Sequence, residues 1–265
     1  MIQVKLVSKS YDSSHVIQNI SFHVKKGESF GIIGPNGSGK STLLKLCSGI
    51  EKAEGGTIQF ANKEIHTYSR KHLAKWVAVL QQEALPPVGF SVREVVEMGR
   101  YPYQNWMGTE EKDPEHLIVD ILEKLEIKAL QNRSLEQLSG GERQRVALGK
   151  VMAQQPQILM LDEPTTYLDI GHQLQMMEYI REWQQQIGLT VISVLHDLNL
   201  AAMYCDRLLL LHEGRLVKVG TAAEIINQEL ISQVYGTEPT IISHPQLKVP
   251  QILLNSDRVP TTVNE

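Results

Sequence analysis

The sequence predicts an α/β protein built on a mainly parallel sheet, and three observations lead to that prediction. Apolar runs of strand type at 30–33, 158–161 and 191–195 are separated by segments with helical periodicity. Strands that alternate with helices form mainly parallel sheets. Near the N-terminus two segments alternate apolar and polar residues, which predicts a small antiparallel sheet. An amphipathic stretch after Pro114 predicts a helical part between the β-rich parts.

Composition bounds the architecture and the partners. The chain has 265 residues, 42% hydrophobic and 21% charged, which is enough for one large domain or two intimate ones. Its net charge of −4 shows no basic excess, so a nucleic acid is not an expected partner. No stretch approaches the ~20 apolar residues that span a bilayer, and the first residues lack a signal-peptide core, so we expect a cytosolic chain. Cys47 and Cys205 form no metal-ligand spacing and are expected to be reduced, buried thiols.

The two N-terminal segments are interpreted as half-buried strands. Their inward-facing residues are expected to be Ile2, Val4, Leu6, Ile20, Phe22 and Val24. Tyr11 lies between them, where an aromatic ring can stack on a purine base. A tyrosine in a turn is more often a packing residue, so the pattern alone leaves both roles open.

The most informative stretch begins directly after the strand at 30–33. A glycine, four residues and then Gly-Lys-Ser form the phosphate-binding pattern, here between a strand and the start of a helix. Backbone N–H groups of such a loop surround an anion, with the helix N-terminus behind them. The predicted nucleotide-binding residues are Gly34, Pro35, Asn36, Gly37, Ser38, Gly39, Lys40, Ser41 and Thr42. We expect Lys40 to reach the β- and γ-phosphates and Ser41 to contact Mg²⁺, which makes the core that of a phosphate-loop NTPase.

The middle of the chain, about 86–150, is predicted to be a helical insertion. A buried strand at 76–80 ends at Gln81 and Gln82, and the loop at 83–89 is a candidate subdomain boundary.

Within the insertion, Ser91 is an expected N-cap, with Glu94 as its capping-box partner. Pro114 is expected to open a strongly amphipathic helix. A further helix begins at the Ser-Gly-Gly sequence of 139–141. That sequence offers free N–H groups to an anion, or is only a helix cap, and spacing does not decide between the two.

Two carboxylates follow the buried strand at 158–161. Burying Asp162 and Glu163 without a partner would be costly, and a nucleotide with Mg²⁺ supplies that partner. We expect Asp162 to coordinate Mg²⁺ through water and Glu163 to face the γ-phosphate. Ligands bind at the carboxyl ends of parallel strands, so Gly34, Asp162 and His196 should converge, with His196 on the γ-phosphate.

The C-terminal part carries less chemistry. We expect a β-hairpin at 208–219, helix over 221–235 and an extended tail from Gly236, in which 252–254 docks on the body of the protein.

Together these motifs resemble the ATPase subunit of an ABC transporter. The phosphate loop, the Leu-Ser-Gly-Gly-Glu sequence at 138–142, the strand that ends at Glu163, and His196 occur in that family's order over residues 1–235. The 138–142 motif is the most specific, because it separates this family from other phosphate-loop NTPases. The implied signature residues, which contact the ATP of the opposite protomer, are Ser139, Gly140, Gly141 and Glu142.

The resemblance also implies roles for single residues. Asp169 belongs to a loop that crosses the dimer interface, and Tyr11 matches the base-stacking aromatic residue. The family usually has Pro-Gln where this chain has two glutamines, so Gln82 is aligned with the metal- and water-contacting residue and Gln81 is the alternative. The implied catalytic residues are Glu163, His196, Gln82 and Lys40. The implied Mg²⁺ ligands are Ser41, Gln82 and Asp162.

The implied fold is an ABC ATPase cassette over 1–235 with a short extension at 236–265. The implied cofactors are ATP and Mg²⁺. The implied partners are a second copy of the chain, integral-membrane permease subunits and an extracytoplasmic substrate-binding protein, at the cytoplasmic face of the cell membrane.

Gly-Arg-Tyr-Pro at 99–102, followed by Trp106, resembles the subgroup that imports iron-siderophores, haem and cobalamin. We expect import of a ferric siderophore, with haem or cobalamin as alternative cargoes. The alternative to any functional role is that these aromatic residues only pack the surface of the insertion. A soluble ABC ATPase acting on nucleic acid or ribosomes is the competing class, but the interval between Lys40 and Asp162 is too short for its coiled coil.

Overall fold

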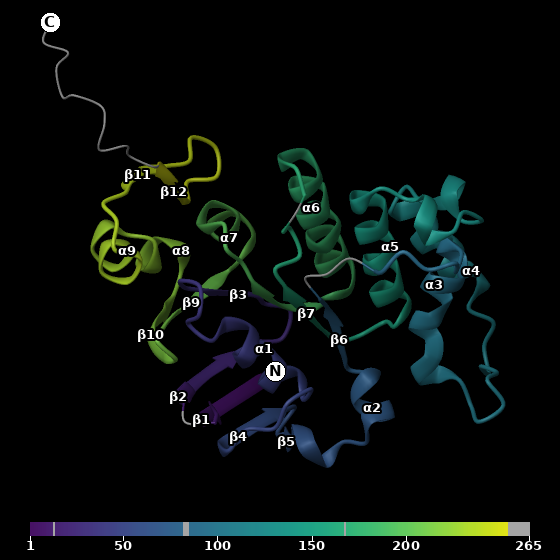
Figure 1. The fold of residues 1–265 in the computed structure, drawn as a ribbon, viewed down its shortest axis with the longest axis horizontal. Coiled ribbons are helices and arrows are strands. Elements are labelled where there is room, and N and C mark those ends of the chain that lie inside the picture. The colour runs from purple at the N-terminus through teal and green to yellow at the C-terminus, as the bar shows by residue number, and fades with distance from the viewer. Residues whose placement is uncertain (13, 82–84, 167, 254–265) are drawn as a thin grey trace, which may run out of the picture.

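The computed structural model describes residues 1–12, 14–81, 85–166 and 168–253. Figure 1 shows a central sheet with helices on both sides, a small antiparallel sheet below it, a helical lobe at one end and the C-terminal elements at the other. This is the predicted α/β architecture with an antiparallel part and a helical part. Within the described ranges, none of the helices has the length and apolar character needed to cross a membrane.

The small sheet has the order β2-β1-β4-β5 and is antiparallel, as predicted for its first two strands. Its strands are β1 (Ile2–Tyr11), β2 (Ser14–Val24), β4 (Gly55–Phe60) and β5 (Lys63–Glu64).

The expected inward position of Leu6 is wrong. The pairing of β1 shifts register between Val4 and Val7, and Leu6 has φ 48. A bulge adds one residue to one strand and reverses the faces beyond it. Val7 is therefore fully buried, whereas Leu6 is 63% exposed.

The large sheet has six strands in the order β10-β9-β3-β8-β7-β6. All neighbouring pairs are parallel except β10 with β9, which confirms a mainly parallel sheet. Its strands are β3 (Ser29–Ile33), β6 (Val77–Leu80), β7 (Ile158–Asp162), β8 (Thr190–Val194), β9 (Arg207–His212) and β10 (Arg215–Gly220). The expected hairpin at 208–219 is β9 with β10.

The two faces of this sheet bury two separate cores, because successive side chains of a strand point to opposite faces. On one face, Ile158 and Met160 pack with helix α1 (Lys40–Ser48) and the small sheet. On the other, Leu159 and Leu161 pack with the remaining helices. Helix α1 is thus held between the two sheets (Figure 1).

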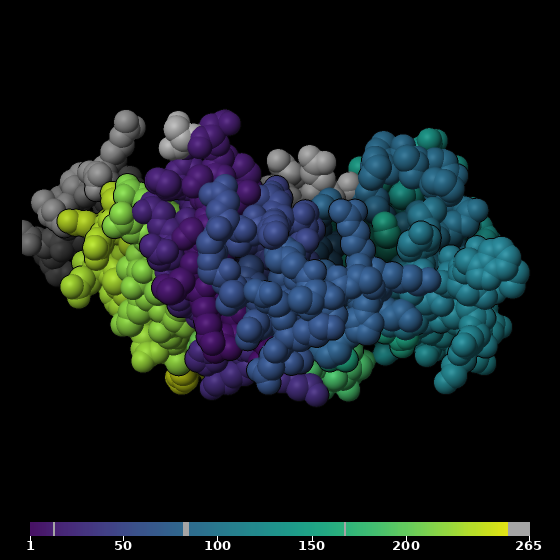
Figure 2. Space-filling model, turned by 90° about the horizontal axis from the view of Figure 1, so that it is seen from below, coloured from purple at the N-terminus to yellow at the C-terminus, as the bar shows by residue number. Residues whose placement is uncertain are grey.

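The second face is covered by α6 (Ile170–Ile187) and α7 (Leu198–Tyr204), and the lobe's α5 (Gly140–Ala153) shares their core. The helical lobe also holds α3 (Val92–Glu97) and α4 (Glu115–Lys124). Figure 2 shows residues of about 90–115 at the end of the molecule farthest from the C-terminal elements. Short helical elements complete the fold: α2 (Arg70–Ala74) and 3-10 turns at Ile65–Thr67, Met98–Tyr103, Lys128–Leu130 and Leu135–Gln137.

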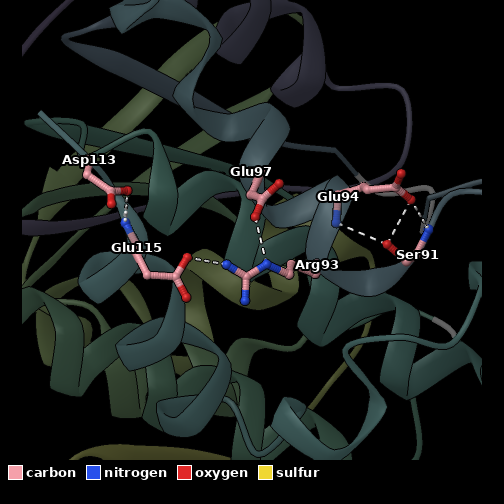
Figure 3. A network of polar contacts seen from close by, with 6 residues as sticks. All are labelled: Ser91, Arg93, Glu94, Glu97, Asp113 and Glu115. Atoms are coloured by element: carbon pink, nitrogen blue, oxygen red, sulfur yellow. Dashed lines mark hydrogen bonds and ion pairs between the residues drawn. The ribbon is translucent and has the colours of Figure 1, made fainter. Parts of the chain in front are cut away.

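Polar contacts join α3 to α4 at their N-terminal ends (Figure 3). The predicted capping box at Ser91 is present, with Glu94 accepting from the Ser91 N–H at 2.7 Å. Arg93 pairs with Glu97 one turn later and with Glu115 in the first turn of α4. The lobe is therefore tied by charges as well as by its apolar core.

The C-terminal part is more regular than expected. Residues 221–235 are helical, as predicted, but form two helices, α8 (Ala222–Ile225) and α9 (Gln228–Tyr235). The tail is not simply extended, because β11 (Thr240–Ser243) and β12 (Pro250–Leu253) pair as an antiparallel hairpin. Ile252 packs on the body as expected; Leu254 lies outside the described residues. Both thiols are free, and Cys47 is buried while Cys205 is only partly so.

Candidate active site

The phosphate loop connects the carboxyl end of β3 to the N-terminus of α1, in the predicted strand-loop-helix order. Gly34 has φ 152, and a Cβ atom there would lie 2.0 Å from the Leu211 carbonyl oxygen. Gly39 caps α1 with φ 101 and makes no side-chain cap bond. Only glycine fits these two positions, and the loop amides at the helix N-terminus are left for an anion.

Lys40 is 5% exposed and points back into the loop. Its Nζ donates to the carbonyl oxygens of Gly34 at 2.9 Å and Pro35 at 3.0 Å. Burial lowers the pKa of Lys40, and the nearby Glu163 and Asp162 oppose that shift. A phosphate placed here would stabilise the ammonium further, because an opposite charge favours the charged form.

Ser38 lies beside Gly34, and its buried hydroxyl finds no hydrogen-bond partner among the described residues. Buried polar groups are nearly always satisfied, so a group in this state calls for a ligand. A phosphate oxygen would satisfy it.

Ser41 and Asp162 meet across the gap between α1 and β7. The Ser41 hydroxyl donates to Asp162 Oδ1 at 2.9 Å. Burial raises the pKa of Asp162, and the bond from Ser41 partly offsets that rise. A hydroxyl and a carboxylate are hard oxygen donors, which are the ligands that Mg²⁺ prefers. The pair therefore fits the metal that was expected there.

Glu163 and His196 form the second pair of side chains in contact at the site. His196 Nε2 contacts Glu163 Oε1, and the Thr166 hydroxyl donates to the other carboxylate oxygen at 3.4 Å. Glu163 has φ 52, while its N–H donates to Val194 O at 3.1 Å. A non-glycine residue in the left-handed region is strained, and such strain is concentrated at functional sites.

Lys40, Ser41, Glu163 and His196 line one cavity of about 350 Å³. Its walls are Val16, Asn36, Gly37, Gly39, Lys40, Ser41, Thr42, Glu163 and His196. The three strand ends thus converge at one edge of the sheet. Val16 was not singled out from the sequence, because an apolar residue in a strand carries no signal of ligand contact.

Tyr11 is not among the residues that line this cavity. Its hydroxyl contacts the Glu51 carboxylate, which raises the pKa of the phenol, and the Lys9 ammonium lies 5.2 Å from the ring centroid. The ring is 41% exposed, so a face remains available for a base. Base stacking by Tyr11 stays a prediction.

The Ser-Gly-Gly sequence begins a helix, as expected, but it lies outside the cavity. Ser139 caps α5 in a capping box: its N–H donates to Glu142 Oε2 at 2.7 Å, and its hydroxyl accepts from the Glu142 N–H at 3.3 Å. The bond from the Ser139 N–H lowers the pKa of Glu142. Gly140 has open space around it, since a Cβ there would meet nothing within 4 Å.

The signature is connected to the catalytic segment of the same chain. The buried side chain of Gln144 donates to Pro164 O at 3.1 Å. Asp169 caps α6 and accepts from the N–H of His172 at 2.9 Å and pairs with its Nδ1 at 2.7 Å. A Cβ on Gly141 would lie 3.1 Å from His172 Cδ2, so this ring rests on the signature. Sequence reasoning missed Gln144 and His172.

The two glutamines after β6 differ in what can be said of them. Gln81 is exposed at the end of the strand. Gln82, the expected metal-contacting residue, lies outside the described residues, so its role stays a prediction.

The fold and this site define a phosphate-loop ATPase. The model of the family described as ABC transporter matches residues 17–166. The chain belongs to the ABC transporter family and is an ATPase of that family.

Relatives of known name match over nearly the whole chain. The petrobactin import ATP-binding protein FpuC of Bacillus anthracis is 40% identical over 241 residues, which cover 91% of this chain and 89% of FpuC. The ferric enterobactin transport ATP-binding protein FepC of Escherichia coli (strain K12) is 37% identical, covering 96% and 94%. The hemin import ATP-binding protein HmuV of Thermobifida fusca (strain YX) is 39% identical, covering 93% and 86%.

Solved structures of cassettes agree with the fold. The cbiO1 structure from Clostridium perfringens, part of the transporter complex cbiONQ, has a TM-score of 0.74 at 31% identity, covering 88% of this chain and 92% of that one. The ATP-binding cassette MJ0796, a dimer in a post-hydrolysis state bound to ADP and Pi, has a TM-score of 0.73 at 26% identity, covering 83% and 98%.

Proposed function

We propose that this chain is the ATP-hydrolysing subunit of an importer for a ferric siderophore. The named relatives are ATP-binding proteins of petrobactin import, ferric enterobactin transport and hemin import, so an iron chelate is the cargo class that they favour. Haem is the second candidate, carried by the hemin relative. The net charge of −4 gives no support to a nucleic-acid substrate.

One observation carries the ATPase part of this proposal. Lys40, Ser41, Glu163 and His196 line a single cavity at the carboxyl edge of the sheet, and Asp162 accepts a hydrogen bond from Ser41 beside it. A cation, two oxygens suited to Mg²⁺ and a carboxylate suited to act as a base support this proposal, because phosphoryl transfer requires such a set.

In the proposed mechanism, the loop amides and Lys40 hold the β- and γ-phosphates. Glu163 accepts a proton from the attacking water, and His196 holds the γ-phosphate and orients that water. Water attacks phosphorus, the bond to the ADP oxygen breaks, and ADP and phosphate form.

Mg²⁺ bound with ATP would neutralise charge on the phosphates, and Ser41, Asp162 and Gln82 are the residues proposed to hold it. Among the described residues, no cluster of three or more histidine, cysteine, aspartate or glutamate side chains could hold a metal alone. A site that relies on few protein oxygens together with substrate phosphates is usual for Mg²⁺.

The proposal of a dimer concerns the signature residues, which do not line the cavity. Ser139, Gly140 and Gly141 are outside its walls, so we propose that they contact the ATP of a second copy. ATP then stabilises the closed dimer, because those contacts exist only there. Loss of the γ-phosphate would open it, with the loop at Asp169 at the interface.

The proposed organisation assigns parts to partners. Residues 1–235 form the cassette, with the helical subdomain at about 86–150, and 236–265 form a C-terminal extension. The helical subdomain and the Gln82 loop would pass motion to integral-membrane permease subunits at the cytoplasmic face of the membrane. An extracytoplasmic binding protein would deliver the cargo.

Uptake by cells that lack this chain tests the proposal. We would complement them with the wild type or Glu163→Gln and offer labelled ferric siderophores, haem and cobalamin in parallel. We expect ferric siderophore uptake to return with the wild type only. Restored uptake of haem or cobalamin alone would move the cargo to that ligand, and unchanged uptake of all three would contradict the importer subgroup.

A further inference from the structure

The C-terminal hairpin is attached to the helix that follows His196. Asn199, in the first turn of α7, accepts from the N–H of Ile252 at 2.7 Å and donates from Nδ2 to Ile252 O at 3.2 Å. One side-chain amide therefore pairs with both backbone groups of a residue in β12. Two hydrogen bonds from one amide fix the orientation of the side chain as well as its distance from the strand, because the planar amide has to align with the strand that it pairs with.

His196 lies between the Asn199–Ile252 contact and a second contact, which joins the preceding residue to β3. The N–H of Leu195, directly before it, donates to Ile32 O at 3.2 Å. Asp197, directly after it, caps α7 by accepting from the N–H groups of Asn199 at 2.7 Å and Leu200 at 3.0 Å. The His196 backbone is thus held on one side by β3 and on the other by the first turn of α7.

The imidazole itself has little packing to hold it, since 42% of the side chain is exposed. Its direction therefore depends on the contact between Nε2 and Glu163 Oε1 and on the backbone of the segment that carries it. A rotation of α7 about its axis would carry His196 with it. The bonds between Asn199 and Ile252 oppose that rotation from the side of α7 that faces the hairpin.

The end of α9, directly before the extension, lies near the phosphate loop. A second cavity of about 350 Å³ has His196, Asn199, Tyr235 and Ile252 in its wall, so His196 separates it from the nucleotide cavity. Burial raises the pKa of Tyr235, at the end of α9, and the nearby backbone of Gly34 partly opposes that rise. The C-terminal elements thus meet the site at two places: α9 ends near the first residue of the phosphate loop, and the hairpin is bonded to the helix after His196.

We propose that the C-terminal extension positions His196 against the γ-phosphate, and that Asn199 is the positioning residue through which it acts. Asn199 touches no substrate atom in this scheme; it holds α7 so that the imidazole faces the cavity. The inference rests on the proposed role of His196 in hydrolysis. It assigns the extension a part in the reaction beyond completing the fold.

Steady-state hydrolysis of Mg-ATP by the full chain tests this with Asn199→Ala and Asn199→Asp. We expect kcat of Asn199→Ala to fall about tenfold with KM for ATP changed less than about twofold, since misplacing one catalytic group slows chemistry without removing binding. The carboxylate of Asn199→Asp still accepts from the Ile252 N–H but cannot donate to Ile252 O, so its kcat should lie between. Asn199→Asp keeps the shape of the side chain, so its kcat can still be measured if Asn199→Ala folds poorly.

The decisive measurement is the same substitution made in His196→Ala. If Asn199 acts through His196, adding Asn199→Ala to His196→Ala leaves kcat unchanged. A structural role for Asn199 would instead lower kcat by the same factor in both backgrounds, which would overturn the proposal. Asn227→Ala is the matched control, because Asn227 caps α9, the helix directly before the extension, and should leave kcat unchanged.

The outcomes separate this inference from the proposed function. Wild-type chain that fails to hydrolyse ATP would contradict the function itself. Wild-type turnover with equal kcat in Asn199→Ala would contradict only the positioning role.

Discussion

Two helix N-termini in this chain, both proposed to contact phosphate, are built in different ways. Helix α1 begins at Gly39, which makes no side-chain cap bond, and its first turn holds no acidic residue. Helix α5 begins at Ser139, which is closed by a capping box with Glu142. The first terminus is incomplete until an anion arrives, whereas the second satisfies part of its own amides and needs no ligand to be stable.

Under the proposed function, this difference explains why one cassette would contribute to two ATP sites. The terminus of α1 would hold ATP within its own protomer. The terminus of α5, which is already capped, would contact ATP only when a second copy presents it, and could release it without destabilising the lobe. Mutations at the phosphate-loop side should therefore affect folding or ATP turnover, whereas mutations at the signature should affect dimerisation.

The largest expected effect lies in the half that does chemistry. Glu163→Gln should lower ATP turnover by at least about 100-fold, because removing a general base costs that much or more. ATP binding should persist, so the closed dimer should accumulate on size-exclusion chromatography with Mg-ATP. Glu111→Gln, an exposed residue of the helical lobe, is the control. A variant that turned over ATP at the normal rate would contradict the assignment of the base.

Replacing one glycine of the phosphate loop and one glycine of the signature by alanine should separate an effect on folding from an effect on dimerisation. Gly34→Ala should lower the free energy of unfolding by more than about 2 kcal/mol, because a Cβ cannot occupy 2.0 Å from the Leu211 carbonyl without moving the backbone. Chemical denaturation measures this, with Gly89→Ala as control, since a Cβ there meets nothing within 4 Å. An unchanged midpoint would show that the loop relaxes.

The same change in the signature should leave the fold intact. A Cβ on Gly140 meets nothing within 4 Å in one protomer, so the stability of the monomer should not fall. At the interface the methyl group would occupy the space of a phosphate, and ATP-dependent dimerisation in the Glu163→Gln background should weaken about tenfold or more, which is ~1.4 kcal/mol. Dimer affinity measured by light scattering checks this. Undiminished affinity would place the signature away from ATP.

The smallest effect concerns the capping box itself. The pKa of Glu142 is lowered by the bond from the Ser139 N–H, so the carboxylate stabilises the fold above the usual carboxylate pKa range and loses that contribution as pH falls through its lowered pKa. Glu142→Gln should cost about 0.5 kcal/mol at neutral pH, as expected for a partly exposed charge near a helix N-terminus. Thermal melts at pH 7 and under acid should show this difference shrinking as pH falls. A difference that persisted in acid would mean that the charge is not its source.

Much of the fold was readable from local pattern. Strands that alternate with helices predicted the parallel sheet, and period-two alternation predicted the antiparallel pair. Leu6 shows where that reading fails: a bulge adds one residue, and nothing in the apolar pattern marks it, because Leu6 and Val7 are both apolar. The C-terminal hairpin was missed because four prolines in the tail suggested extended chain.

The sequence by itself determined the chemistry. The phosphate loop, the carboxylates after β7 and the histidine after β8 are local motifs whose meaning depends on residue type and on the strand before them. The tertiary structure alone decided which of these groups touch. It placed Glu163 against His196, rested His172 on Gly141 and paired Asn199 with Ile252 across 53 positions of the chain. Those contacts depend on how helices pack on the two faces of the sheet, and packing is set by the whole core instead of by neighbours in sequence.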